Sequence, residues 1–185
     1  MCKMSELFRL FVGIFPSQST QARLNREAEK WCKNLQTEVR VLKPESLHLT
    51  IKFIGNVELT RLDNFTTAFL KATGNLSPTS LQLKQLKLFP SHRKPRVVAA
   101  EINPSLELQS IFQFFNEGFS SLGIIVDRRK FHPHITVART RHWQKETISP
   151  TPIQIVEPIE SIDLIHSQLT PEGAKYSIVA SIPLN

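Results

Sequence analysis

Two short segments, in which polar and apolar residues alternate, constrain the fold of this chain most. Residues 46–54 read SLHLTIKFI, and residues 133–139 read PHITVAR. A period of two is typical of a strand with one buried face, because side chains i and i+2 point to the same side. In the first segment, His48 and Thr50 should therefore share one face, while the apolar residues between them and Phe53 point into the core.

Both segments carry the same pattern of histidine, apolar residue, threonine, apolar residue. The second copy is His134-Ile135-Thr136-Val137. A single such pattern arises often by chance, whereas two copies in two expected strands are a much more specific signal. If the two strands lie side by side, one cleft receives two imidazoles and two hydroxyls.

The rest of the chain alternates between strand-like and helix-like stretches. Apolar residues at helical spacing predict helices over 19–36, 58–73 and 104–122. Strands are expected over 7–14, 39–42, 79–89, 96–102, 160–167 and 174–182, with Gly55-Asn56 ending the strand of the first motif, and a mobile loop over 140–152. This mixture predicts one α+β domain spanning 1–185, without an interdomain linker.

The charge balance favours a polyanionic partner. The 185 residues include 23 Lys and Arg against 16 Asp and Glu, a net charge of +7. Such a surface suits nucleic acid through phosphate contacts, although many basic proteins bind none. No apolar stripe is left over once the core faces are assigned, so a monomer with no obligate protein partner is expected.

The chain carries no pattern typical of export or membrane insertion. No uncharged apolar run reaches the roughly 18 residues that span a bilayer, and Glu6 and Arg9 interrupt the apolar residues near the start. Cys2 and Cys32 form no C-x-x-C pair, so a disulfide framework is not indicated. We expect no membrane association and a cytoplasmic location.

Two histidines with two threonines suit phosphodiester chemistry. One neutral imidazole can take a proton from the attacking oxygen, and one imidazolium can give a proton to the leaving oxygen, since the unperturbed pKa of histidine is about 6.5. Hydroxyl donors can stabilise the charge on the phosphate oxygens. A metal site is the main alternative, because His132 and His134 could both act as ligands, but neither motif contains an acidic residue. We expect no metal and no cofactor.

The motifs and their flanks resemble one known family. The stretches 9–14, 44–57, 89–98, 131–139 and 164–176 are similar to the two-histidine phosphoesterases, and among them to the RNA 2′,3′-cyclic phosphodiesterases, also known as bacterial and archaeal 2′-5′ RNA ligases. The segment Phe131 to Arg139 is the most specific. The chain departs from the family at Val41-Leu42, where an aromatic residue is frequent, and at Ala99-Ala100, where a tryptophan is frequent. Neither departure touches the histidines or threonines.

The resemblance implies two pseudo-symmetric lobes of mainly antiparallel sheet, with helices outside, around a central cleft. It also implies hydrolysis of RNA 2′,3′-cyclic phosphate ends to 2′-phosphates. On this basis His134 activates water and His48 protonates O3′, although the near-symmetry of the motifs allows the reverse assignment. Thr50 and Thr136 would hold the phosphate.

Two further residues are candidates for RNA contacts. Arg139 follows the second motif and could bind a neighbouring phosphate, or lie solvated at a strand end. Phe11 could stack on a nucleobase, or simply belong to the core. The motifs are also compatible with cleavage or joining of 2′-5′ linkages in tRNA halves or oligoadenylate, and with hydrolysis of another cyclic nucleotide phosphate. A non-catalytic RNA-binding module is the alternative from a different class of protein.

Overall fold

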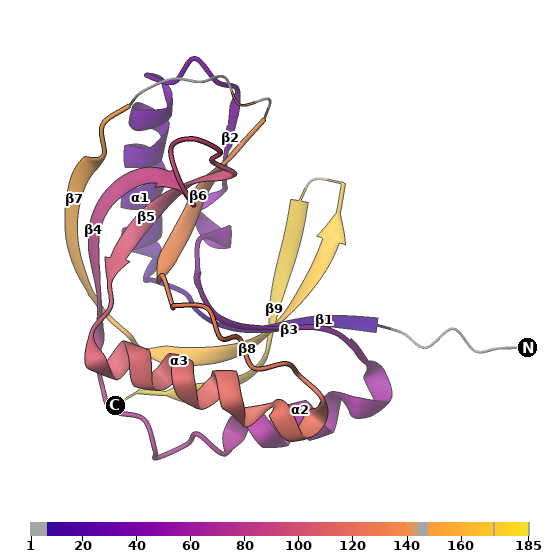
Figure 1. Cartoon of the computed structure of the whole chain (residues 1–185). Coiled ribbons are helices and arrows are strands. Elements are labelled where there is room, and N and C mark those ends of the chain that lie inside the picture. The colour runs from indigo at the N-terminus through magenta and orange to yellow at the C-terminus, as the bar shows by residue number, and fades with distance from the viewer. Residues whose placement is uncertain (1–6, 142, 144–147, 172, 185) are drawn as a thin grey trace, which may run out of the picture.

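The computed structural model of the chain describes residues 7–141, 143, 148–171 and 173–184. In these residues, three helices accompany a sheet of nine strands (Figure 1). The strands are β1 (Leu7–Ile14), β2 (Val39–Val41), β3 (Leu49–Glu58), β4 (Ser80–Phe89), β5 (Val97–Asn103), β6 (His134–Thr140), β7 (Thr151–Pro158), β8 (Ser161–Thr170) and β9 (Gly173–Pro183). The helices are α1 (Gln18–Cys32), α2 (Leu62–Leu70) and α3 (Leu106–Gly118), with 3₁₀ turns at Pro44–Ser46, Leu59–Arg61 and Ser120–Leu122.

The sheet consists of two similar halves that meet at the two motif strands. Its order is β7-β4-β5-β6-β3-β1-β8-β9, with β2 also paired to β6, and every pairing is antiparallel. Reading outward from the centre, each half is a run of four strands that begins with a motif strand. The halves are hydrogen-bonded at a single registered pair, Leu49 with Ile135. The expected α+β class with mainly antiparallel sheet is confirmed.

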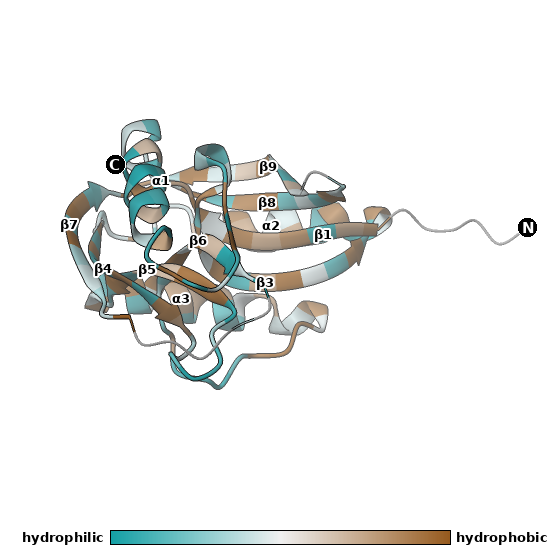
Figure 2. Ribbon diagram, turned by 90° about the horizontal axis from the view of Figure 1, so that it is seen from above, coloured by the Kyte–Doolittle hydropathy of each residue, from teal (hydrophilic) through white to brown (hydrophobic). Residues whose placement is uncertain are grey.

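Each half-sheet is covered by its own helices. α1 packs on β2, β6 and β7, whereas α2 and α3 pack on the other half through β9 and β3 (Figure 1). Buried phenylalanines join α2 to α3, including the stacked pair Phe69 and Phe115. Figure 2 shows hydrophilic stretches along α1, whose buried residues include Leu24, Ala28 and Trp31. No helix in the described ranges is long and apolar enough to cross a membrane.

Three local expectations differ from the structure. The β7 strand was not predicted, and it begins inside the stretch 140–152 that the sequence suggested as a loop, part of which lies outside the described residues. β3 does not end at Gly55, which adopts a positive φ of 93° and lets the strand continue to Glu58. The helix expected over 58–73 is split into a 3₁₀ turn and α2.

The expected orientation of Phe53 is wrong. Its side chain is 62% exposed and lies beside Phe11, 6.0 Å between ring centroids. The reason is a register shift in the β1–β3 ladder, where Val12 pairs with Lys52 but the next residue, Gly13, pairs with Thr50. Ile51 is thus an extra residue in β3, and an extra residue reverses the faces of the side chains that follow it.

Candidate catalytic site

The pairing of β3 with β6 brings the two motifs together. Leu49 and Ile135, the registered pair, are the middle residues of the two His-x-Thr patterns, and both are buried. Because the strands are antiparallel, the histidine of each motif faces the threonine of the other across this junction. The register of the sheet therefore places the two motifs side by side, as the sequence predicted.

Both imidazoles are oriented in the same way by their own backbone. Nδ1 of His48 lies 2.8 Å from the carbonyl oxygen of Ser46, and Nδ1 of His134 lies 2.8 Å from that of His132. A carbonyl oxygen only accepts, so Nδ1 is the donor in each ring. In the neutral form the free lone pair is therefore on Nε2, and in the charged form Nε2–H is available to donate. Either ring can serve as base or as acid at Nε2.

The surroundings lower the pKa of both histidines below the ordinary value. For His48 the main cause is burial, opposed by the bond to Ser46, with further lowering by the positive charges of Arg139 and His134. For His134 the main cause is again burial, opposed by the bond to His132, with lowering by the charges of His132 and Lys87. The influence of His134 on His48 also places the two rings within electrostatic reach of each other.

The two threonines are available to a ligand. Thr50 and Thr136 are half-buried. In β6, Thr136 pairs with Ala99 and His134 pairs with Glu101 without a register shift between them, so the two side chains lie on the same face of the sheet. Thr50 lies two residues after His48 in the same way. Within the described part of the chain, neither threonine hydroxyl hydrogen-bonds another residue. Both can donate to phosphate oxygens.

Aromatic rings hold each imidazole in place. The ring of Phe89 stacks on His134 with centroids 4.1 Å apart. Phe11 and Tyr176 each approach His48 to 4.9 Å, Tyr176 edge-on. Phe11 is only 2% exposed, so its ring has no open face for a nucleobase, and the structure gives it the alternative role of a core residue that supports His48.

Gly13 permits this packing beside His48. A Cβ atom at Gly13 would lie 2.9 Å from the carbonyl oxygen of Leu49, 2.9 Å from Cε2 of Phe11 and 3.1 Å from Cδ1 of Ile165. The close approach of β1 to β3 at the first motif therefore requires glycine. The sequence offered no signal for this role.

Arg139 lies near the histidine pair. It is exposed on β6, and its positive charge contributes to the lowered pKa of His48. Burial raises the pKa of Tyr176, and the charge of Arg139 opposes that rise. A guanidinium in this place can bind an anion beside the imidazoles.

The described residues hold no group of three His, Cys, Asp or Glu that could bind a metal ion. His132, the second histidine of the metal alternative, is exposed and supplies its carbonyl oxygen to His134.

A buried lysine supports the second motif, and sequence reasoning missed it. Lys52, 6% exposed, donates from Nζ to Oδ1 of Asn116 (2.7 Å) and to the carbonyl oxygen of Ile125 (2.8 Å). The Asn116 side chain also bonds both backbone groups of Asp127, with distances of 2.8 Å. This network fixes the irregular segment that leads into His134. Lys52 occupies a polar position in the alternating pattern of this segment, so nothing in the sequence distinguished it from an exposed lysine.

Comparisons with known proteins agree with this architecture. The family model described as LigT-like phosphoesterase matches residues 14–99, which include the first motif. A relative from Methanocaldococcus jannaschii named RNA 2′,3′-cyclic phosphodiesterase is 25% identical over 180 residues, covering 92% of this chain and 98% of that protein. A protein of the same name from Bacillus subtilis is 26% identical over 64% of this chain, and the chain spans 61% of its length. Another, from Geobacillus stearothermophilus, is 29% identical over 76% of this chain, which spans 46% of its length.

Solved structures show the same fold. A crystal structure of a protein from Thermus thermophilus superposes with a TM-score of 0.82 at 25% identity, covering 95% of this chain and 97% of that one. The Escherichia coli LigT complexed with 3′-AMP gives a TM-score of 0.81 at 21% identity, covering 97% and 99%. With two His-x-Thr strands at the centre of this fold, the chain is similar in sequence and architecture to the LigT-like phosphoesterases, which supports its assignment to the two-histidine phosphoesterases.

Proposed function

We propose that this protein is an RNA 2′,3′-cyclic phosphodiesterase that leaves a 2′-phosphate and needs no metal ion. The observation that carries the proposal is the matched pair of imidazoles, each with Nδ1 held by a backbone carbonyl and Nε2 free, flanked by two threonine hydroxyls that bond no described residue. Relatives that align with most of this chain are named RNA 2′,3′-cyclic phosphodiesterase, which supports the same reaction.

In the proposed reaction, neutral His134 takes a proton at Nε2 from a water molecule, whose oxygen forms a bond to phosphorus. The bond from phosphorus to O3′ breaks on the opposite side, and His48 donates the proton from its Nε2 to O3′. The phosphate stays on O2′. After the reaction His134 carries the proton taken from water, and His48 has lost the proton given to O3′. Proton exchange with solvent returns both rings to their starting states.

The other residues stabilise the charge that develops on the phosphate. The hydroxyls of Thr50 and Thr136 donate to the non-bridging oxygens. Arg139 supplies positive charge and contacts a neighbouring RNA phosphate. Burial of both imidazoles keeps their pKa low, which favours the neutral form that the base requires.

The test is turnover of a short RNA ending in a 2′,3′-cyclic phosphate, with EDTA present, followed by identification of the product end. The expected product is a terminal 2′-phosphate. Either His48→Asn or His134→Asn should lower kcat by at least about 100-fold, the scale of one acid or base. Loss of wild-type activity in EDTA would contradict the metal-free mechanism. Equal RNA binding by wild type and both variants without any turnover would instead indicate a binding module.

A further inference from the structure

Two cavities lie near the candidate site, one lined by His134 and the other lined by aromatic residues that contact His48, and the two differ in charge. The cavity beside His48 has a volume of about 530 Å³ and is lined by three carboxylates, from Glu45, Glu160 and Asp163, with no lysine or arginine. Phe15 and Tyr176, whose rings contact His48, belong to its lining, whereas His48 itself does not. A phosphate would be repelled from this cavity.

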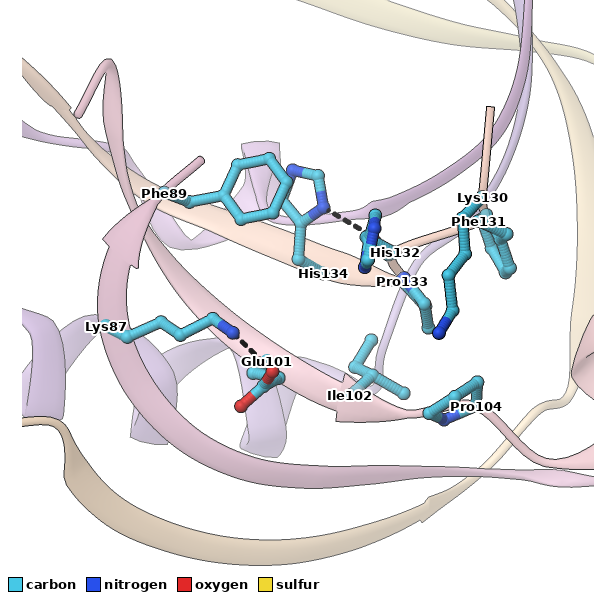
Figure 3. A pocket seen from close by; sticks show the side chains of 10 residues that line it. All are labelled: Lys87, Phe89, Glu101, Ile102, Pro104, Lys130, Phe131, His132, Pro133 and His134. Atoms are coloured by element: carbon cyan, nitrogen blue, oxygen red, sulfur yellow. Dashed lines mark hydrogen bonds and ion pairs between the residues drawn. The ribbon is translucent and has the colours of Figure 1, made fainter. Parts of the chain in front are cut away.

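The cavity beside His134 has the opposite character (Figure 3). Its volume is about 220 Å³, and its charged lining consists of Lys87, Lys130 and Glu101, together with the imidazoles of His132 and His134. Apolar side chains, including Phe131 and Pro133, form much of the remaining wall. Lys87 and Glu101 are half-buried in this cavity, whereas Lys130 is exposed.

Pairing within the cavity leaves one cation over. Lys87 forms an ion pair with Glu101, and Nε2 of Gln85 donates to the same carboxylate (2.7 Å). Burial of Glu101 acts to raise its pKa, but these hydrogen bonds outweigh burial and lower it, so the carboxylate stays charged and cancels Lys87. The Lys130 ammonium forms no ion pair with any residue in the described ranges. Figure 3 shows the Lys130 side chain reaching along the wall towards Pro133.

We propose that the cavity beside His134 is a subsite for a second, non-reacting phosphate of the RNA, with the Lys130 ammonium as its main contact. The inference rests on the proposed function and deepens it. The cavity shares His134 with the reacting centre, so a phosphate bound there belongs to the neighbouring nucleotide unit. Terminal RNA ends therefore bind more productively than an isolated nucleoside cyclic phosphate.

A neighbouring phosphate can come from either side of the reacting one, and two substrate pairs distinguish these sources. The first pair is adenosine 2′,3′-cyclic phosphate with and without a 5′-phosphate. The second pair is 2′-5′-linked diadenosine monophosphate with and without a 3′-phosphate on its second nucleoside. For each pair, kcat/KM is measured in wild type, in Lys130→Ala and in Lys130→Arg.

In one of the two pairs, the added phosphate should raise wild-type kcat/KM about fivefold to tenfold, the scale of one charged contact at a partly exposed site. Lys130→Ala should lose this gain, Lys130→Arg should retain much of it, and all variants should act alike on the unphosphorylated substrate. Lys71→Ala is the matched control, because it removes the same charge from the exposed end of α2. It should keep the full gain.

The outcomes separate the two proposals. No gain from the added phosphate in either pair, or a gain that survives in Lys130→Ala, would overturn the subsite while leaving the phosphodiesterase proposal intact. Absence of turnover of all four substrates would overturn the proposed function and the subsite with it. A rise in kcat/KM in the first pair would show that the cavity binds the phosphate on the 5′ side of the reacting nucleoside. A rise in the second pair would show that it binds the phosphate that follows a 2′-5′ linkage.

Discussion

Replacing Gly13 with alanine tests how closely β1 and β3 must approach at the first motif. The new Cβ atom would lie 2.9 Å from both the Leu49 carbonyl oxygen and Cε2 of Phe11. The carbonyl is backbone and the Phe11 ring is packed on His48, so neither can move without displacing the motif. Overpacking of this kind costs about 1–3 kcal/mol in free energy of unfolding. For a chain of this length, Tm should fall by roughly 2–12 °C.

The same substitution should reduce activity. A displacement of the first motif by even a fraction of an ångström misaligns His48 with the reacting phosphate, and errors of about 1 Å can cost about 100-fold in rate. We expect kcat for a cyclic-phosphate RNA to fall by about tenfold or more, with a smaller change in KM. Thermal unfolding and steady-state kinetics on the same preparation measure both effects.

Gly118→Ala is the matched control. Gly118 lies at the end of α3, where an added methyl group would meet no atom within 4 Å and where φ suits any residue. Alanine there should leave activity unchanged and stability equal to wild type, or higher by up to about 1 kcal/mol. If Gly13→Ala matched this control in both Tm and kcat, the reasoning on close approach would be refuted.

Three other predictions address charge. The pH–rate profile should be bell-shaped with its maximum below about pH 6.5, because burial lowers the pKa of both His48 and His134. The protonated acid is lost as pH rises through its pKa. A flat profile from about pH 5 to 8 would contradict paired histidine catalysis. Glu157→Gln should cost about 1–3 kcal/mol at neutral pH, since this carboxylate accepts bonds from the first turn of α1. The hydrogen bonds lower the pKa of Glu157 despite burial. The carboxylate therefore stabilises the fold above its unfolded pKa, and this stabilisation is lost as pH falls through the lower folded pKa. Urea unfolding of wild type and Glu157→Gln should accordingly show a smaller difference in free energy of unfolding at pH 3 than at pH 7. Lys52→Met should lower the free energy of unfolding in urea by about 1–3 kcal/mol and reduce kcat more than KM, because the segment before His134 loses its anchor; unchanged kcat would show that the anchor does not position the histidine.

Periodicity predicted most elements because each buries one face. The strands at 7–14 and 79–89 and the helix at 19–36 were visible because their apolar residues recur at the right spacing. β7 was missed because Pro150 and Pro152 suggest a loop, although Ile153 and Ile155 alternate with exposed residues as an outer strand requires.

The two motifs were predictable, but the groups that orient them were not. The pairing of Leu49 with Ile135 is between residues far apart in the chain, and no local pattern encodes the extra residue Ile51 that turns Phe53 to the surface. The Lys52–Asn116 bond likewise joins two elements that only the tertiary fold brings together. Sequence patterns report burial, whereas partners across the sheet depend on register.

The backbone bond to each Nδ1 has a consequence for how this protein can diverge. In each motif the acceptor is the main-chain carbonyl two residues before the histidine, so no other side chain is needed to select the tautomer. Substitution elsewhere can reshape the cavities, charges and strand edges without switching the proton between ring nitrogens. The proposed acid–base pair is thus encoded within two short stretches of chain, and the surfaces around it can change independently.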